Sequence, residues 1–169
     1  MKQLNIGIIG AGRIGKLHAQ SITYAVPAAR VYGITDVRTD GLQELKDKFG
    51  IEKIYTSVDD MLADKAIDAV LVCSSTDTHA DIAIQAAKAG KHIFCEKPVD
   101  LTPEKVEAVL DAVKTAGVKL QVGFNRRFVC ASWSIRRRSV NWSLSRSPRA
   151  TRSRHPRNTR QAPAACSSI

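Results

Sequence analysis

The sequence predicts an α/β protein built on a doubly wound parallel sheet of about six strands, followed by an irregular basic tail. Strand-like apolar runs and amphipathic helical segments alternate about six times before residue 128. A glycine-rich turn separates the first apolar run from the first helical segment. Residues 67–73 form a nearly continuous apolar run, which is typical of a parallel strand covered on both faces. These three observations together predict the doubly wound arrangement.

The expected strands and helices follow one another in order along the chain. We expect strands at residues 4–9, 28–36, 54–55, 67–73, 91–95 and 119–124. We expect helices from residue 16 onward and at residues 40–49, 57–62, 80–89 and 102–116. Ser57 and Thr102 are residue types that cap helix N-termini, and Gly50 and Gly117 are typical helix stops.

The glycine-rich turn has the spacing Gly10-x-Gly12-x-x-Gly15 between a strand and a helix. In that context the spacing is the fingerprint of a dinucleotide-binding turn, although a glycine-rich turn without a ligand is the alternative. Gly10 allows the tight turn, Gly12 lets the backbone approach a pyrophosphate, and Gly15 lets the helix lie close to the strand. The helix N-terminus offers free N–H groups to the phosphates. We therefore expect a cofactor cradle made of Gly10, Ala11, Gly12, Arg13, Ile14 and Gly15.

An acidic residue ends the second expected strand. Asp36 lies 21 residues beyond Gly15, where a dinucleotide fold places the carboxylate that accepts hydrogen bonds from the ribose hydroxyls. A carboxylate at this place repels a 2′-phosphate, so the sequence favours NAD over NADP. Arg38 is a nearby cation that weakens this preference for NAD. The alternative role for Asp36 is that of a turn residue at the end of the strand.

Two polar stretches follow later strands. Residues 74–79 leave the fourth strand, and they are either helix caps or part of a ligand site at the carboxyl edge of the sheet. Residues 96–98 follow the fifth strand, and Pro98 restricts the backbone of Lys97. This restriction predicts a rigidly held lysine at the same edge.

Composition restricts the classes of function. The chain has 169 residues, no apolar run near the roughly 20 residues of a membrane span, and no apparent signal peptide. Its four cysteines show no metal-binding spacing, and Cys73 and Cys95 lie in apolar strands, where reduced buried thiols are common. We therefore expect a cytoplasmic protein with neither a membrane anchor nor a bound metal.

The charge lies in the tail. The net charge is +10, but nine of the 26 basic residues and none of the 16 acidic residues follow residue 128. The first 128 residues are therefore nearly neutral, which argues against a nucleic-acid-binding domain.

Together these motifs resemble the N-terminal domain of the Gfo/Idh/MocA family of sugar and polyol dehydrogenases, with a Rossmann-type NAD-binding fold. The resemblance rests on residues 10–15, Asp36, residues 74–79, Cys95-Glu96-Lys97-Pro98 and residues 122–128. Residues 94–98 and 123–128 look most like those of inositol 2-dehydrogenases. The resemblance covers about residues 3–128 and so implies an NAD-binding domain at 1–128.

The resemblance also implies roles for individual residues. Lys97 is the implied catalytic residue, hydrogen-bonded to the substrate hydroxyl that becomes a ketone. The implied cofactor-binding residues beyond the glycine turn and Asp36 are Arg38, Ser74, Ser75, Thr76, His79, Glu96, Lys97 and Pro98. The implied substrate residues are Lys97, Asn125 and Arg127.

The implied reaction is NAD-dependent hydride transfer that oxidises myo-inositol to its 2-keto form. The family's second domain supplies an Asp and a general-base His, and neither has a match in this chain. We therefore expect a truncated, inactive copy of an enzyme whose full-length relatives form homo-oligomers. The alternatives are a free-standing NAD-binding module with a nucleic-acid-binding arm, and another sugar dehydrogenase of the family.

Residues 129–169 have nine Arg, nine Ser and no acidic residue. A disordered tail and a basic arm that binds nucleic acid are two interpretations. Translation out of frame is a third interpretation, and it explains more of the features of this segment than the other two. One set of codons for residues 163–169, read in a shifted frame, gives Gly-Gly-Leu-Phe-Leu-Asp, which resembles the start of the family's second domain. This interpretation predicts a single-base insertion or deletion near the Phe128 codon.

Overall fold

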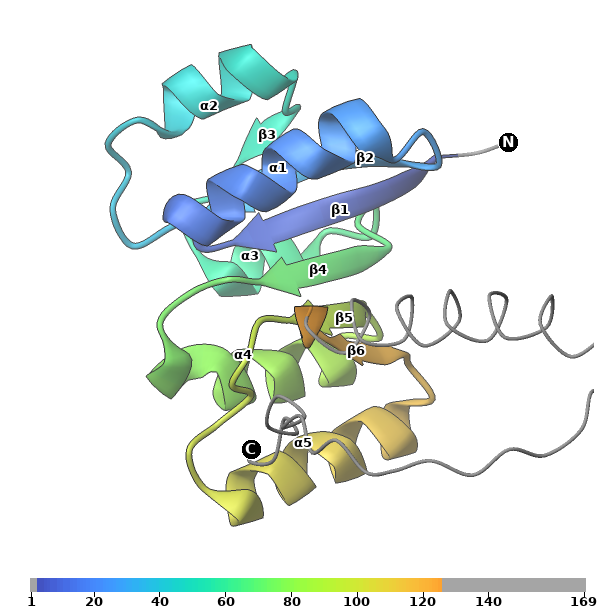
Figure 1. Cartoon of the computed structure of the whole chain (residues 1–169). Coiled ribbons are helices and arrows are strands. Elements are labelled where there is room, and N and C mark those ends of the chain that lie inside the picture. The colour runs from blue at the N-terminus through green and yellow to red at the C-terminus, as the bar shows by residue number, and fades with distance from the viewer. Residues whose placement is uncertain (1–2, 126–169) are drawn as a thin grey trace, which may run out of the picture. The chain divides into compact units, whose positions relative to one another are not determined.

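The computed structural model describes residues 3–125 of the chain (Figure 1). The strands are β1 (Leu4–Ile9), β2 (Ala29–Thr35), β3 (Lys53–Ile54), β4 (Ala69–Val72), β5 (His92–Cys95) and β6 (Leu120–Val122). They form one sheet in the order β3-β2-β1-β4-β5-β6, and every neighbouring pair is parallel. This is the doubly wound sheet that the sequence predicts, so the fold prediction is confirmed. The tail predicted at 129–169 lies outside the described residues.

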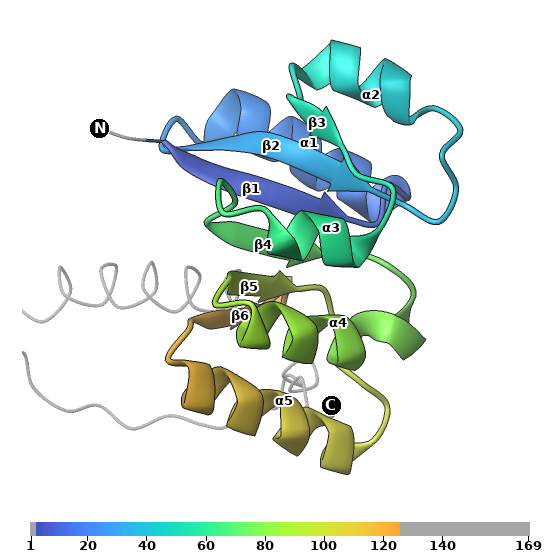
Figure 2. The ribbon, with the colours of Figure 1, turned by 180° about the vertical axis from the view of Figure 1, so that it is seen from behind.

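Five helices connect the strands and cover both faces of the sheet. They are α1 (Arg13–Ala25), α2 (Leu42–Phe49), α3 (Val58–Ala63), α4 (Thr76–Lys88) and α5 (Pro103–Ala116). Helices α1 and α2 lie on one face, and α3, α4 and α5 lie on the other (Figures 1 and 2). None of these helices is both long enough and apolar enough to cross a membrane.

Each face of the sheet has its own apolar core. Beneath α1 and α2, buried helix residues such as Ala19, Leu42 and Phe49 pack with Ile8 and Ile34 of the sheet. On the other face the core is formed by residues of α3, α4 and α5 with strand residues, namely Met61, Ala80, Ala83, Val109, Val70, Val72 and Cys95. Because strand side chains are buried on both faces, the parallel strands are nearly continuous apolar runs.

Two helices begin earlier than the sequence pattern predicts. Helix α1 begins at Arg13 rather than at residue 16, and the amide of Lys16 already donates to the Gly12 carbonyl at 3.0 Å. Helix α4 begins at Thr76 rather than at residue 80, with Ser75 as its N-cap residue. The pattern missed both starts because glycines and hydroxyl residues have low helix propensity, whereas tertiary packing determines these first turns.

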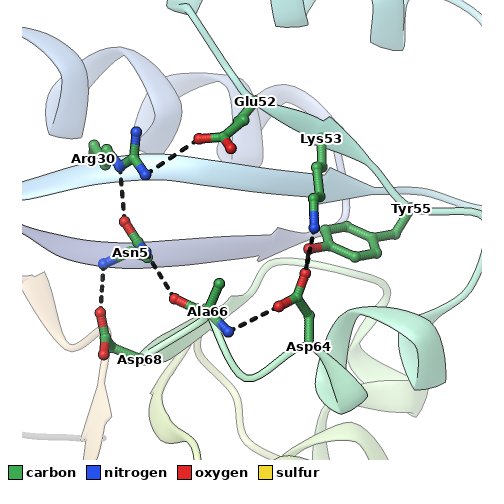
Figure 3. A network of polar contacts seen from close by, with 8 residues as sticks. All are labelled: Asn5, Arg30, Glu52, Lys53, Tyr55, Asp64, Ala66 and Asp68. Carbon is green, nitrogen blue, oxygen red and sulfur yellow. Dashed lines mark hydrogen bonds and ion pairs between the residues drawn. The ribbon is translucent and has the colours of Figure 1, made fainter.

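Asp64 is the centre of a polar network that fixes the loop before β4 (Figure 3). Its carboxylate accepts hydrogen bonds from Lys53 Nζ at 2.8 Å, Tyr55 Oη at 2.7 Å and the Ala66 amide at 2.8 Å. The hydrogen bond from Lys53, followed by those from Ala66 and Tyr55, holds the pKa of Asp64 well below its usual range. The network therefore favours the ionised carboxylate in the folded chain.

Asn5 extends the same network across the beginning of β1 (Figure 3). Its amide donates to Asp68 at 2.8 Å, and its side chain donates to the Ala66 carbonyl and accepts from Arg30, both at 2.8 Å. Arg30 also pairs with Glu52 at 3.2 Å. These contacts join β1, β2 and the residues before β3 and β4.

Replacement of Asp64 by asparagine is expected to lower the free energy of unfolding at pH 7 by about 1–2 kcal/mol, because charge-assisted hydrogen bonds are lost. The pKa of Asp64 is lower in the folded than in the unfolded chain, so its contribution is complete above the unfolded pKa of about 4. It is lost as the pH falls through the lower folded pKa. Urea unfolding of both proteins at pH 7, 5 and 3 tests this expectation. A difference that grows toward pH 3 would contradict it.

Candidate cofactor site

The carboxyl ends of five strands are in register at one edge of the sheet. Ile9 of β1 is paired with Thr35 and Val72, and Cys95 of β5 is paired with Val72 and Val122. The residues that follow these strands therefore meet at the same edge. The predicted site residues that follow these strands are Gly10, Asp36, Ser74, Glu96, Lys97 and Asn125. Ligands of doubly wound sheets bind at this edge, where the strand order reverses between β1 and β4.

Gly10 turns the chain from β1 toward α1 in a conformation that excludes larger residues. Its φ is +98°, and an added Cβ would lie 2.6 Å from the backbone of Cys73 and of Ser74. The Gly10 amide donates to the Thr35 carbonyl at 2.9 Å. An added Cβ on Gly15 would collide with the Gly10 carbonyl, so α1 lies directly against the turn.

Gly12 faces open space, unlike Gly10 and Gly15. An added Cβ there would meet no atom within 4 Å. Gly12 is also the N-cap residue of α1, and the helix start has neither a side-chain cap nor an acidic residue in its first turn. The first N–H groups of α1 are therefore available to an anion, as the fingerprint requires for a pyrophosphate.

Asp36 connects the glycine turn to the loop after β2. One carboxylate oxygen accepts the Ala11 amide at 2.6 Å, and the other accepts the Arg38 amide at 2.8 Å. A cavity of about 510 Å³ opens beside it, lined by Ala11, Gly12, Arg13, Lys16, Asp36, Arg38, Asp40 and Leu45. The cavity thus combines a carboxylate that suits ribose hydroxyls with basic side chains that suit phosphates. Sequence reasoning missed Lys16, although its place directly after Gly15 was a usable signal.

Residues 73–75 connect β4 to α4, and residues 76–79 form the first turn of that helix. Ser74 Oγ and Thr78 Oγ1 are 2.7 Å apart, and Thr76 is the first helical residue. His79 is buried, with Nδ1 2.8 Å from the Pro98 carbonyl and Nε2 3.0 Å from the Ser74 carbonyl. Its ring therefore joins the residues after β4 to those after β5 and leaves no ring nitrogen directed to solvent.

The Lys97 turn, residues 96–98, follows β5. The side chains of Lys97 and Pro98 are exposed, and the peptide bond between them is cis. Glu96 is partly buried and receives hydrogen bonds from His18 Nε2 at 2.8 Å and from the Lys97 amide at 3.2 Å. Sequence reasoning missed His18, whose only signal was its place on the buried side of α1 between Gly15 and Ile22.

Two buried thiols lie beneath this edge. Burial, followed by the charge of Glu96, raises the pKa of Cys73 to about 12 and that of Cys95 to about 11. Both thiols are therefore protonated and unreactive near neutral pH, so they pack as apolar side chains. Within residues 3–125 no group of three or more His, Cys, Asp or Glu residues has the arrangement of a metal site.

The structure describes only some of the predicted substrate residues. Asn125 follows β6 with an exposed side chain, and its amide donates to the Gly123 carbonyl at 2.9 Å. Arg127 lies outside the described residues. The structure thus brings Lys97 and Asn125 to the same edge of the sheet, from β5 and β6 respectively.

A glycine turn, a helix start open to anions and a carboxylate after β2, all at the strand-order reversal, define a dinucleotide-binding domain of the Rossmann type. The chain belongs to the Gfo/Idh/MocA family of oxidoreductases with an NAD-binding Rossmann fold, whose sequence profile matches residues 4–124. The cofactor of this domain is NAD.

Relatives of known sequence include inositol dehydrogenases. The chain is 48% identical over 125 residues to the myo-inositol 2-dehydrogenase of Thermotoga maritima, with 74% of this chain and 37% of the relative covered. It is 43% identical over 125 residues to the inositol 2-dehydrogenase of Rhizobium meliloti, again with 74% and 37% covered. The chain thus spans well under half the length of these curated relatives.

Solved structures lead to the same family. A probable dehydrogenase from Thermotoga maritima matches with a TM-score of 0.74 and 45% identity, covering 82% of this chain and 41% of that one. A scyllo-inositol dehydrogenase from Lactobacillus casei, solved with bound NAD(H) and scyllo-inositol, matches with a TM-score of 0.71 and 37% identity. That match covers 75% of this chain and 38% of the other, so the similarity concerns the NAD-binding domain.

Proposed function

We propose that residues 1–128 are the NAD-binding half of a dehydrogenase that oxidises a polyol of the inositol class, with myo-inositol as the substrate. The observation that carries the proposal is the exposed Lys97 at the carboxyl edge of the sheet, two residues beyond the end of β5. The inositol dehydrogenases among the relatives support the choice of substrate.

Each residue of the edge has a proposed task. Asp36 accepts hydrogen bonds from the ribose hydroxyls, and the first N–H groups of α1 bind the pyrophosphate. Lys97 donates a hydrogen bond to the substrate hydroxyl oxygen and so orients the carbinol carbon. Bound NAD supplies the chemistry of this site as the acceptor of hydride. The further proposed cofactor contacts come from Arg38, Ser74, Ser75, Thr76, Glu96 and Pro98, and Asn125 and Arg127 border the substrate.

His79 has a different proposed task from the one that the family resemblance implies. Both of its ring nitrogens lie beside backbone carbonyls of this chain, and the side chain is only 2% exposed. We therefore propose that it acts on the cofactor indirectly, by holding the residues after β4 against the Lys97 turn.

The chain alone is proposed to be inactive, because the relatives' remaining length would supply the general base and the rest of the substrate pocket. The test is a graft in which residues 4–124 replace the matching segment of the Thermotoga maritima relative. The graft is expected to form NADH from myo-inositol, whereas the 169-residue chain is expected to form none.

Two outcomes of the graft experiment would contradict the proposal. One is a graft that folds and binds NADH but oxidises another sugar in preference to myo-inositol. The other is robust NADH formation from myo-inositol by the 169-residue chain itself. Circular dichroism and NADH titration of each protein separate these outcomes from a failure to fold.

We also propose that residues 129–169 are a product of translation out of frame, because their composition changes abruptly after Phe128. Resequencing of the gene on both sides of that codon is expected to show a single-base insertion or deletion. An intact frame encoding an intended tail would contradict this proposal.

We further propose a cytoplasmic location. Cys73 and Cys95, the cysteines within the described residues, are free and buried, which suits a reducing compartment.

A further inference from the structure

Helix α1 carries a partly buried histidine that contacts the Lys97 turn. His18 Nε2 lies 2.8 Å from Glu96 Oε1, and the two side chains are 24% and 20% exposed. Because an ionised carboxylate only accepts hydrogen bonds, the ring donates from Nε2. The ring also lies edge-on to Phe94, with centroids 5.2 Å apart. The contact joins α1 to the end of β5, although the two residues are 78 positions apart in the sequence.

Glu96 is held on other sides as well. Its Oε2 accepts the Lys97 amide at 3.2 Å, and its own amide donates to the Val72 carbonyl at 2.9 Å. An added Cβ on Gly123 would lie 3.1 Å from Oε1, so the carboxylate lies against the beginning of the chain after β6. A partly buried carboxylate needs such hydrogen-bond donors, and its orientation changes if one is lost. The Glu96 carboxylate thus contacts both His18 and the Lys97 amide.

We propose that His18 is a positioning residue that fixes the Lys97 turn relative to α1 by holding Glu96. The N-terminus of α1 begins five residues earlier, at Arg13, and offers its N–H groups to the pyrophosphate of NAD. His18 thereby couples the pyrophosphate end of the cofactor site to the nicotinamide end. The inference rests on the proposed function in one respect, which is that the nicotinamide lies beside Lys97.

The first test uses the cofactor-free 169-residue chain and amide NMR spectra. His18→Leu is expected to move the Lys97 and Gly123 amide resonances and to leave that of Ala25, at the far end of α1, in place. His18→Gln is expected to retain most of the native shifts, because its side-chain amide can donate to the same carboxylate. Leu17→Ala is the matched control on the same helix, since Leu17 is 56% exposed. Unchanged Lys97 and Gly123 resonances in His18→Leu would overturn the proposal.

The second test compares NADH with ADP-ribose, which lacks the nicotinamide, by calorimetry. His18→Leu is expected to weaken NADH binding about tenfold and ADP-ribose binding less than twofold, because a charge-assisted hydrogen bond near the nicotinamide is lost. His18→Gln is expected to restore most of the NADH affinity. Equal weakening of both ligands would assign His18 a merely structural role and overturn the proposal.

Failure of the proposed function gives a different result. If NADH moves the Lys97 and Gly123 amide resonances of the unaltered chain no more than ADP-ribose does, the nicotinamide does not lie beside Lys97, and the proposed function fails. The amide spectra of the first test still decide whether His18 positions Lys97, because they are recorded without any ligand.

Discussion

Replacement of Gly10 by alanine is expected to lower the free energy of unfolding by about 2–5 kcal/mol, which is a large part of the stability of a small domain. Two costs combine at this position. A φ of +98° is strained for any L side chain, and the new methyl group would lie 2.6 Å from the backbone of Cys73 and Ser74. Gly10 and Cys73 directly follow β1 and β4, and the Cys73 amide donates to the Ile9 carbonyl at 2.8 Å, so little relaxation is available. Urea unfolding followed by circular dichroism measures the loss.

Gly12→Ala is the matched control, for which we expect an unchanged stability and a lowered NADH affinity. Its φ is −64°, and the added methyl group meets no atom within 4 Å, so the stability should change by less than about 0.5 kcal/mol. NADH affinity should fall about tenfold or more, because the methyl group occupies the space through which the pyrophosphate approaches the backbone. A Gly10→Ala protein with the unaltered unfolding midpoint would contradict the first expectation. Undiminished NADH binding by Gly12→Ala would contradict the second.

In the active graft, Lys97→Met is expected to lower kcat/KM for myo-inositol by about 10²–10⁴-fold, the usual contribution of a positioned proton donor or acceptor. The methionine retains most of the length of the side chain and removes only the ammonium group. Because Lys97 is exposed, the free energy of unfolding should be nearly unchanged. Steady-state kinetics combined with urea unfolding measures both quantities.

Lys105→Met is a matched control for this substitution. Lys105 is half-exposed on α5, and its Nζ lies 3.6 Å from Asp100, away from the glycine turn. Its replacement should leave kcat/KM within about twofold of the unaltered graft. A Lys97→Met graft with nearly full activity would show that the ammonium group takes no part in the reaction.

The fold was predictable because its determinants are local. The apolar runs, the glycine spacing and the place of Asp36 at the end of β2 each depend on a few neighbouring residues. The doubly wound parallel sheet is confirmed, and right-handed connections between parallel strands are typical of it. The pattern misplaces the start of α1 because close packing of Gly15 against the glycine turn outweighs low helix propensity there. It misplaces the start of α4 because Ser75 and Thr76 have low helix propensity, although Ser75 is the N-cap residue.

The contacts that hold the site residues in place were not predictable in the same way. His18 and Glu96 meet across 78 residues, and Asp64 receives donors from β3, from the residue after β3 and from its own loop. Contacts of this kind depend on the three-dimensional register of distant strands, which no local pattern contains. The role of His79 shows the same limitation, because its partner Pro98 is 19 residues away.

The two outermost strands of the described sheet are its shortest, with two residues in β3 and three in β6. A strand at the rim of a sheet offers unpaired backbone groups to other chains, and a short one offers few of them. Intermolecular strand addition, the first step of amyloid-like growth, therefore finds little backbone on β3 or β6 themselves. Because β3 pairs only with Gly33 and Ile34 of β2, the first residues of β2 are the part of that rim where a strand of another chain would find backbone to pair with.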